Sequence, residues 1–181
     1  MYTISLSLPF TTSRWLRLKS LMKNLKPILY AGALVGVLDI TAAFIQVYVA
    51  SRMKPVRLLQ GIAAGVLGRA AAVNGGLATA ALGLAMHFTM ALTVTTVFYL
   101  LSRRFPAMLR HAVPAGLGYG VTVFAVNNFI TAPFMSWVRS LYLHTPVLLK
   151  GPMGWPQLVI HMFCVGLPIA LVVRRYVNGE S

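Results

Sequence analysis

Acidic side chains are the first residues in this sequence that could do chemistry, because there are only two of them. Asp39 lies inside an apolar run over residues 28–50, whereas Glu180 lies in the C-terminal tail. Placing a carboxylate near the centre of a bilayer costs at least about 2.5 kcal/mol. Asp39 is therefore a candidate functional residue, and a purely structural role as a protonated or hydrogen-bonded packing group stays open.

Two histidines and an asparagine occupy other apolar runs at a similar depth. We counted residues along each helix from the basic or aromatic residue that bounds it. By this count, four polar residues lie between the middle and the outer side of a membrane: Asp39, His87, Asn127 and His161. This agreement predicts one intramembrane polar cluster.

Three interpretations of this cluster stay open. Asp39 and His87 would form a proton-responsive pair, because histidine titrates near neutral pH and a carboxylate favours its charged form. Alternatively, His87 and His161 would ligate a metal ion or haem between facing helices. In the third interpretation the cluster is a static clasp that fixes helix register. Arg69 is a further candidate partner of Asp39, if the segment that carries it dips into the membrane.

Catalytic motifs are missing from the sequence. It contains no GxSxG, HExxH or P-loop pattern. With one of the two carboxylates in the tail, paired-carboxylate chemistry has no second partner. We expect a non-enzymatic protein that needs no cofactor.

Composition indicates the environment in which these residues act. Of 181 residues, 58% are hydrophobic and 10% are charged, against roughly 25% charged in a soluble domain. Such a chain is neither disordered nor an ordinary soluble globule. Its partner is the lipid bilayer. Nucleic-acid binding is excluded, despite a net charge of +14, because the Lys and Arg residues punctuate the ends of apolar runs.

The apolar runs predict an all-α integral membrane protein. Four transmembrane helices over about 28–50, 77–101, 112–131 and 156–173 would form a compact bundle within a membrane domain of residues 27–175. A glycine-interrupted segment, about 56–73, is too short to span and predicts an interfacial or re-entrant helix between the first two spans. Trp137, Tyr142 and Trp155 are placed in the loop before the last span, as an interfacial aromatic belt.

The two ends of the chain receive separate interpretations. Residues 1–26 form a basic leader, which is either an amphipathic surface helix or a stretch before a true translation start at Met22. Residues 176–181 form a short tail. Ten of the 16 Lys and Arg residues fall on the side that holds both termini, which predicts cytoplasmic N- and C-termini.

Small residues mark the helix faces that would avoid lipid. In membranes, glycines permit close helix packing. The candidates are Gly32, Gly36, Gly83, Gly116 and Gly120. Most such positions pack within a bundle, and a homo-oligomer through these glycine-rich faces is the alternative.

Several runs also resemble YagU-type proteins, which are small bacterial inner-membrane proteins with a domain of unknown function. The resemblance covers about residues 22–175 and is carried best by GALVGVLDITAA at 32–43, ALGLAMHF at 81–88 and HMFCVGLP at 161–168. It implies a bacterial inner-membrane location and supplies no activity or catalytic residue. A role in acid tolerance is loosely attached to the family and suits an Asp–His pair.

These observations lead to one functional expectation and two alternatives. The leading expectation is a proton-responsive polar site that would assist ion or small-solute movement. The first alternative is an accessory subunit whose polar residues only fix packing, and the second is a haem- or metal-binding membrane protein.

Overall fold

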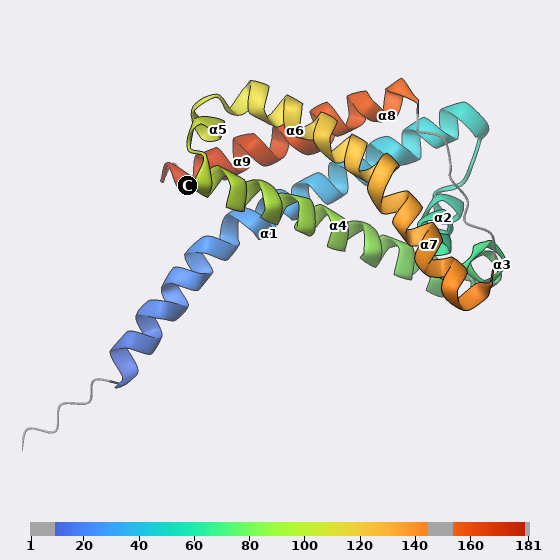
Figure 1. Ribbon diagram of the computed structural model, residues 1–181, viewed down its shortest axis with the longest axis horizontal. Helices are drawn as coiled ribbons and strands as arrows, with labels where there is room; N and C mark the ends of the chain where they lie inside the picture. The colour runs from blue at the N-terminus through green and yellow to red at the C-terminus, as the bar shows by residue number, and fades with distance from the viewer. Residues whose placement is uncertain (1–9, 145–153, 180–181) are drawn as a thin grey trace, which may run out of the picture.

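The computed structural model describes residues 10–144 and 154–179, and these fold entirely into helices joined by short turns (Figure 1). In chain order the elements are α1 (Phe10–Ser51), α2 (Pro55–Leu67), α3 (Arg69–Asn74), α4 (Gly76–Arg104), α5 (Ala107–Arg110), α6 (Ala112–Val126), the π-helix η1 (Asn127–Thr131), α7 (Ala132–Leu143), α8 (Trp155–Ile160), the π-helix η2 (His161–Gly166) and α9 (Leu167–Val177).

Four helical stretches are long and apolar enough to cross a membrane. They cover Leu25–Ser51, Gly76–Arg104, Ala112–Leu143 and Trp155–Val177, with mean hydropathy from 1.3 to 2.1. A hydrocarbon core needs roughly 20 residues of helix. The prediction of an all-α, multi-pass membrane protein with four spans is confirmed at this level.

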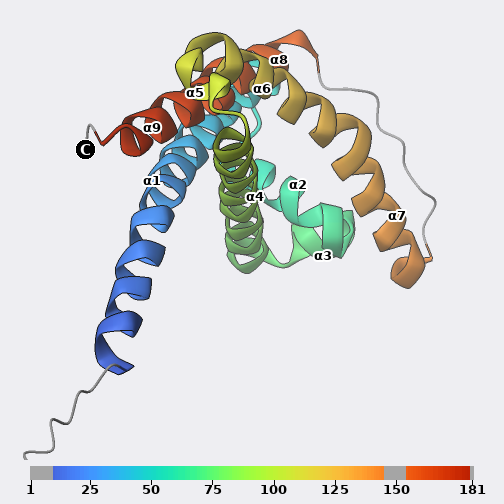
Figure 2. The same ribbon diagram turned by 60° about the vertical axis from the view of Figure 1, so that its left-hand side comes forward.

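Helix α1 lies at the centre of the packing. It contacts α4 on one side and α9 with η2 on the other, while α6 packs against η2 and α9 (Figures 1 and 2). Val35, Phe98, Ile169 and Val173 are almost fully buried where these helices meet. The order α4–α1–α9–α6 therefore brings one face of each span toward a shared interior.

All five candidate packing glycines lie against another helix of the same chain. Gly32 and Gly36 of α1 face α4, Gly83 faces α2, and Gly116 and Gly120 of α6 face η2 and α9. A methyl group at any of these positions would lie closer than 3.0 Å to an atom of the neighbouring helix. These glycine faces are thus covered within one chain.

The third span differs from its predicted end. Instead of stopping at 131 before Pro133, the helix continues through η1 into α7 and ends at Leu143. Pro133 is tolerated because the π-turn before it already breaks the regular backbone hydrogen bonding that a proline would remove. As a result Trp137 and Tyr142 lie on α7, and Trp155 begins α8, so none of these aromatic residues lies in the loop predicted to hold them.

Two other predicted segments are also reshaped. Helix α1 is continuous across residue 26, so the expected leader and the first span form one helix from Phe10 onward; residues 1–9 lie outside the described part of the chain. The segment 56–73 becomes two helices, α2 and α3, separated at Gly68, whose φ of 78° suits glycine. Helix α2 packs beside α4 at Gly83, alongside the first third of that span.

Candidate functional site

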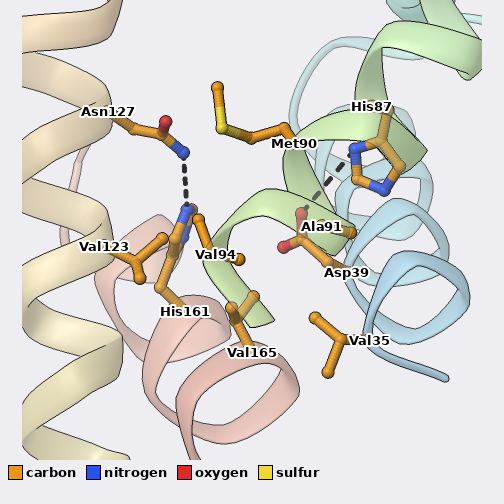
Figure 3. A pocket seen from close by; sticks show the side chains of 10 residues that line it. All are labelled: Val35, Asp39, His87, Met90, Ala91, Val94, Val123, Asn127, His161 and Val165. Atoms are coloured by element: carbon orange, nitrogen blue, oxygen red, sulfur yellow. Dashed lines mark hydrogen bonds and ion pairs between the residues drawn. The ribbon is translucent and has the colours of Figure 1, made fainter. Parts of the chain in front are cut away.

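A small, partly open cavity lies where the four spans converge. Its volume is about 60 Å³, and it is lined by Asp39, His87, Asn127 and His161 together with apolar side chains (Figure 3). The apolar lining comes from Val35, Met90, Ala91, Val94, Val123 and Val165. The structure therefore brings all four predicted cluster residues to one place. The space is large enough for water-sized groups, but it is far below the 300 Å³ at which ordinary cofactor pockets begin.

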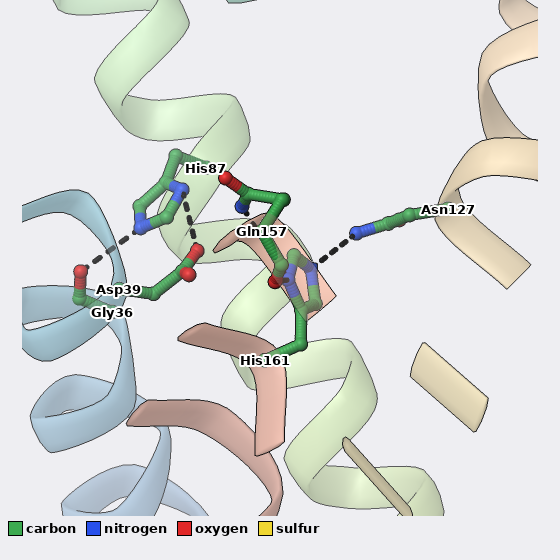
Figure 4. Close-up of polar contacts among 6 residues, drawn as sticks. All are labelled: Gly36, Asp39, His87, Asn127, Gln157 and His161. Carbon is green, nitrogen blue, oxygen red and sulfur yellow. Dashed lines mark hydrogen bonds and ion pairs between the residues drawn. The ribbon is translucent and has the colours of Figure 1, made fainter. Parts of the chain in front are cut away.

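Asp39 and His87 form the first of two polar pairs, between α1 and α4. Asp39 Oδ2 lies 4.0 Å from His87 Nδ1, with side-chain exposures of 18% and 12%. On its other side, His87 Nε2 donates to the Gly36 carbonyl at 2.9 Å (Figure 4). Gly36 positions this bond, because the missing side chain lets α4 approach the α1 backbone.

Hydrogen bonding restricts the protonation states of this first pair. A carbonyl oxygen only accepts, so His87 Nε2 must carry a hydrogen and Nδ1 must be the nitrogen that faces Asp39. Asp39 Oδ1 is buried without a hydrogen-bond partner. A bare Nδ1 beside an ionised, half-satisfied carboxylate would be costly. One proton held by either group leaves the pair neutral overall.

His161 and Asn127 form the second polar pair, between η2 and η1. His161 is only 4% exposed, and its Nδ1 donates to the Gln157 carbonyl one turn earlier at 2.8 Å. Its Nε2 is then free to accept from Asn127 Nδ2, at 3.4 Å (Figure 4). Both ring nitrogens thus have neutral partners, and a neutral imidazole satisfies the whole arrangement.

The two π-helical segments begin at the residues of this second pair. Asn127 is the first residue of η1 and His161 the first residue of η2. Each segment is followed within two residues by a proline, Pro133 or Pro168, which cannot donate a backbone hydrogen bond. π-turns are rare and occur frequently at functional sites. Here they turn an asparagine and a histidine from different spans toward each other.

Arg69 does not join the cluster. It lies exposed at the start of α3, and among the described residues the ion pair of Asp39 is with His87. The reason is the break at Gly68, which places α3 beside the first turns of α4 instead of extending α2 toward the bundle interior.

Metal ligation has no support from ligand geometry. Within residues 10–144 and 154–179, no three His, Cys, Asp or Glu side chains are grouped closely enough to hold a metal ion. His87 and His161 line the same cavity, but each ring already has hydrogen-bond partners from its own pair.

Sequence reasoning missed some of the polar residues that shape the site and its surroundings. Gln157 precedes His161 by four residues, so helical spacing alone could have identified it. Arg139 could not be identified in this way, because it donates to the Ala64 carbonyl near the C-terminus of α2, 75 residues away. Gln60 is buried and donates to the Gly76 carbonyl at 2.9 Å, which ties α2 to the start of α4.

Comparison of the chain with protein-family models, with curated proteins and with solved structures gives no match. The function must therefore be inferred from the geometry of the cavity and its two polar pairs.

Proposed function

We propose that this protein is a non-enzymatic membrane protein whose Asp39–His87 pair binds and releases a proton inside the membrane. One observation carries the proposal: Asp39 Oδ1 is buried without a partner while Oδ2 faces the only free nitrogen of His87. A carboxylate used solely for packing would be expected to have both oxygens hydrogen-bonded. The unused acceptor marks Asp39 as a group whose proton can come and go.

The surroundings support a proton instead of a fixed counter-ion. No Lys or Arg is among the described residues that line the cavity. The other titratable groups near Asp39 are His161 across the cavity and Cys164 of η2, which interacts electrostatically with Asp39. His161 is held by neutral partners, so His87 is the group best placed to exchange a proton with Asp39.

The cellular setting is part of the same proposal. The distribution of basic residues supports N- and C-termini in the cytoplasm. A bacterial inner-membrane location is what the resemblance to YagU-type proteins implies. In this orientation the cavity lies between the middle and the periplasmic side, where it would respond to external acid.

Infrared spectroscopy offers a direct test, because the chain has only two acidic side chains. The purified protein in lipid would be titrated while the stretching band of the protonated carboxyl group is followed. We expect a band that disappears in Asp39→Asn and persists in the matched control Glu180→Gln. In His87→Gln the band should persist to higher pH, because Asp39 loses the neighbour that stabilises its charged form.

Two results would contradict the proposal. If Asp39→Asn leaves the carboxyl band unchanged, Asp39 does not exchange a proton in the accessible range. If the band is lost in Asp39→Asn but is insensitive to His87→Gln, the two residues do not act as a pair. Either result would favour the alternative in which the polar residues only fix helix packing in an accessory subunit.

A further inference from the structure

An elongated apolar groove runs between α4 and α6 and meets the polar cavity at one end. Its volume is about 630 Å³, well within the range of ligand sites. Met90, Val94, Val123 and Asn127 line both the groove and the cavity. On α4 the groove extends from Met90 to Leu101, a distance of roughly 16 Å along the helix.

Three of the four hydroxyl groups that line the groove already donate to backbone carbonyls, and the fourth belongs to Thr131, one turn after Asn127. The Tyr119 hydroxyl donates to the Val94 carbonyl at 2.6 Å and so bridges the two helices. Thr93 and Thr122 donate to carbonyls of their own helices at 2.8 and 3.0 Å. Along most of the groove an occupant therefore meets apolar side chains and hydroxyl groups whose hydrogens are already donated, and a long hydrocarbon chain fits this lining.

The groove is open toward the membrane. Val97 and Val126 on its two walls are 44% and 41% exposed, and the helices that carry them are two of the candidate spans. A chain could therefore enter sideways from the hydrocarbon layer. Its end would arrive at the cavity, where Asp39 Oδ1 lacks a donor and Asn127 lies at the boundary.

Charge decides which head group suits that end. The described residues that line the groove and the cavity include Asp39 but no Lys or Arg. A phosphate or carboxylate head would have no Lys or Arg to meet and would lie beside the carboxyl group of Asp39, which is unfavourable. A neutral hydroxyl can instead donate to the unpartnered Asp39 oxygen and accept from Asn127, and it is small enough for a cavity of about 60 Å³.

We infer that the α4–α6 groove binds a single-chain amphiphile with a neutral hydroxyl head, of the long-chain alcohol class, with the hydroxyl at Asp39 and Asn127. The inference rests on the proposed function in one respect, because a neutral head is favoured by a pair that holds one proton. It identifies what the cavity recognises, whereas the proton exchange describes how the cavity responds.

Photolabelling of the full-length protein in lipid tests this inference. The probes are a long-chain primary alcohol with a diazirine in its chain, the fatty acid of equal length, and a phosphatidylglycerol with the same labelled chain. We expect the alcohol to label α4 and α6 about tenfold more than either anionic probe, since a second negative charge beside Asp39 is disfavoured. Unlabelled alcohol should compete.

Two variants locate the site. Val97→Trp should fill the groove and abolish labelling, while the matched control Leu100→Trp should not, because Leu100 is 60% exposed on the same helix and does not line the groove. Asp39→Asn should raise labelling by the fatty acid toward that of the alcohol.

The outcomes separate this inference from the proposed function. Equal labelling by all three probes, or labelling that survives Val97→Trp, would overturn the inference and indicate ordinary lipid contact. Crosslinks between two copies at the groove would also overturn it, with a second chain as occupant. A normal Asp39 carboxyl titration with no selective labelling would refute only the inference about what the groove binds. Selective labelling without an Asp39 titration would refute only the proposed proton exchange at Asp39.

Discussion

The two polar pairs that line the cavity contain the same residue type, histidine, and differ in how completely it is held. His161 is buried, and neutral partners meet both ring nitrogens. His87 has one firm hydrogen bond, to Gly36, and faces a carboxylate at 4.0 Å that has one oxygen unpaired. The first arrangement is complete with a neutral ring, whereas the second leaves one buried carboxylate oxygen without a hydrogen-bond donor.

The helix packing around the pairs shows the same contrast. At the His161 pair, α6 meets η2 backbone to backbone, because Gly120 and Gly166 leave no side chains between them. At the His87 pair, the three atoms nearest to a Cβ at Gly36 belong to the ring of Phe88, and a side chain can move. One pair is fixed by the backbone, while the other has room to adjust. We therefore expect His161–Asn127 to act as a structural clasp, and we place the proposed proton exchange at Asp39–His87.

The largest expected effect comes from adding a methyl group at the two glycines. In Gly120→Ala the new Cβ would lie about 2.6 Å from Met162 Cα, so backbone must shift. Overpacking of this kind costs roughly 1–3 kcal/mol, and we expect the upper part of that range. Gly36→Ala meets only the Phe88 ring, so its loss should be smaller.

Thermal unfolding in detergent measures this difference, with Gly118→Ala as the matched control. Gly118 lies on α6 with open space around it, so alanine there should be neutral or slightly stabilising. If Gly36→Ala destabilises as strongly as Gly120→Ala, the distinction between a fixed and an adjustable crossing is wrong.

The second prediction concerns the histidines themselves. His161→Leu leaves Asn127 and the Gln157 carbonyl without their shared partner and should cost about 1–3 kcal/mol at any pH. His87→Leu removes the neighbour of Asp39. The free energy of unfolding lost in His87→Leu should increase as pH rises, because an ionised Asp39 would then be mostly buried with no group to balance its charge.

Unfolding measured for both variants at acidic and alkaline pH tests this prediction. The wild-type protein measured in the same buffers removes any general effect of pH on the fold. The prediction is wrong if the loss of stability in His87→Leu does not depend on pH, or if the loss of stability in His161→Leu does. Either result would contradict the roles that we expect for the two pairs.

Much of this arrangement follows from the sequence, and the part that does not has a physical cause. The four apolar runs indicate the spans, and the common depth of Asp39, His87, Asn127 and His161 indicates that they gather. The pairing of Asp39 with His87 is one of the interpretations that the sequence offers. The pairing of Asn127 with His161 does not follow from it, because this pairing depends on π-turns at both residues that shift the register within a helix. A proline usually ends a predicted helix, so the continuation of the third span through Pro133 was also out of reach.

The smallest expected effect is the coupling between the two pairs across the cavity. Within a pair, a double-mutant cycle such as Asp39→Asn with His87→Gln should give about 1 kcal/mol, since the two side chains lie 4.0 Å apart. Between pairs, Asp39→Asn with Asn127→Ala should give less than about 0.5 kcal/mol, because no hydrogen bond between the pairs is found among the described residues. Stability measurements on the three single and two double variants decide the matter. A coupling energy across the cavity as large as that within a pair would mean that the four residues form one network. Protonation of Asp39 would then change the interactions of His161, and the His161–Asn127 clasp would itself respond to pH.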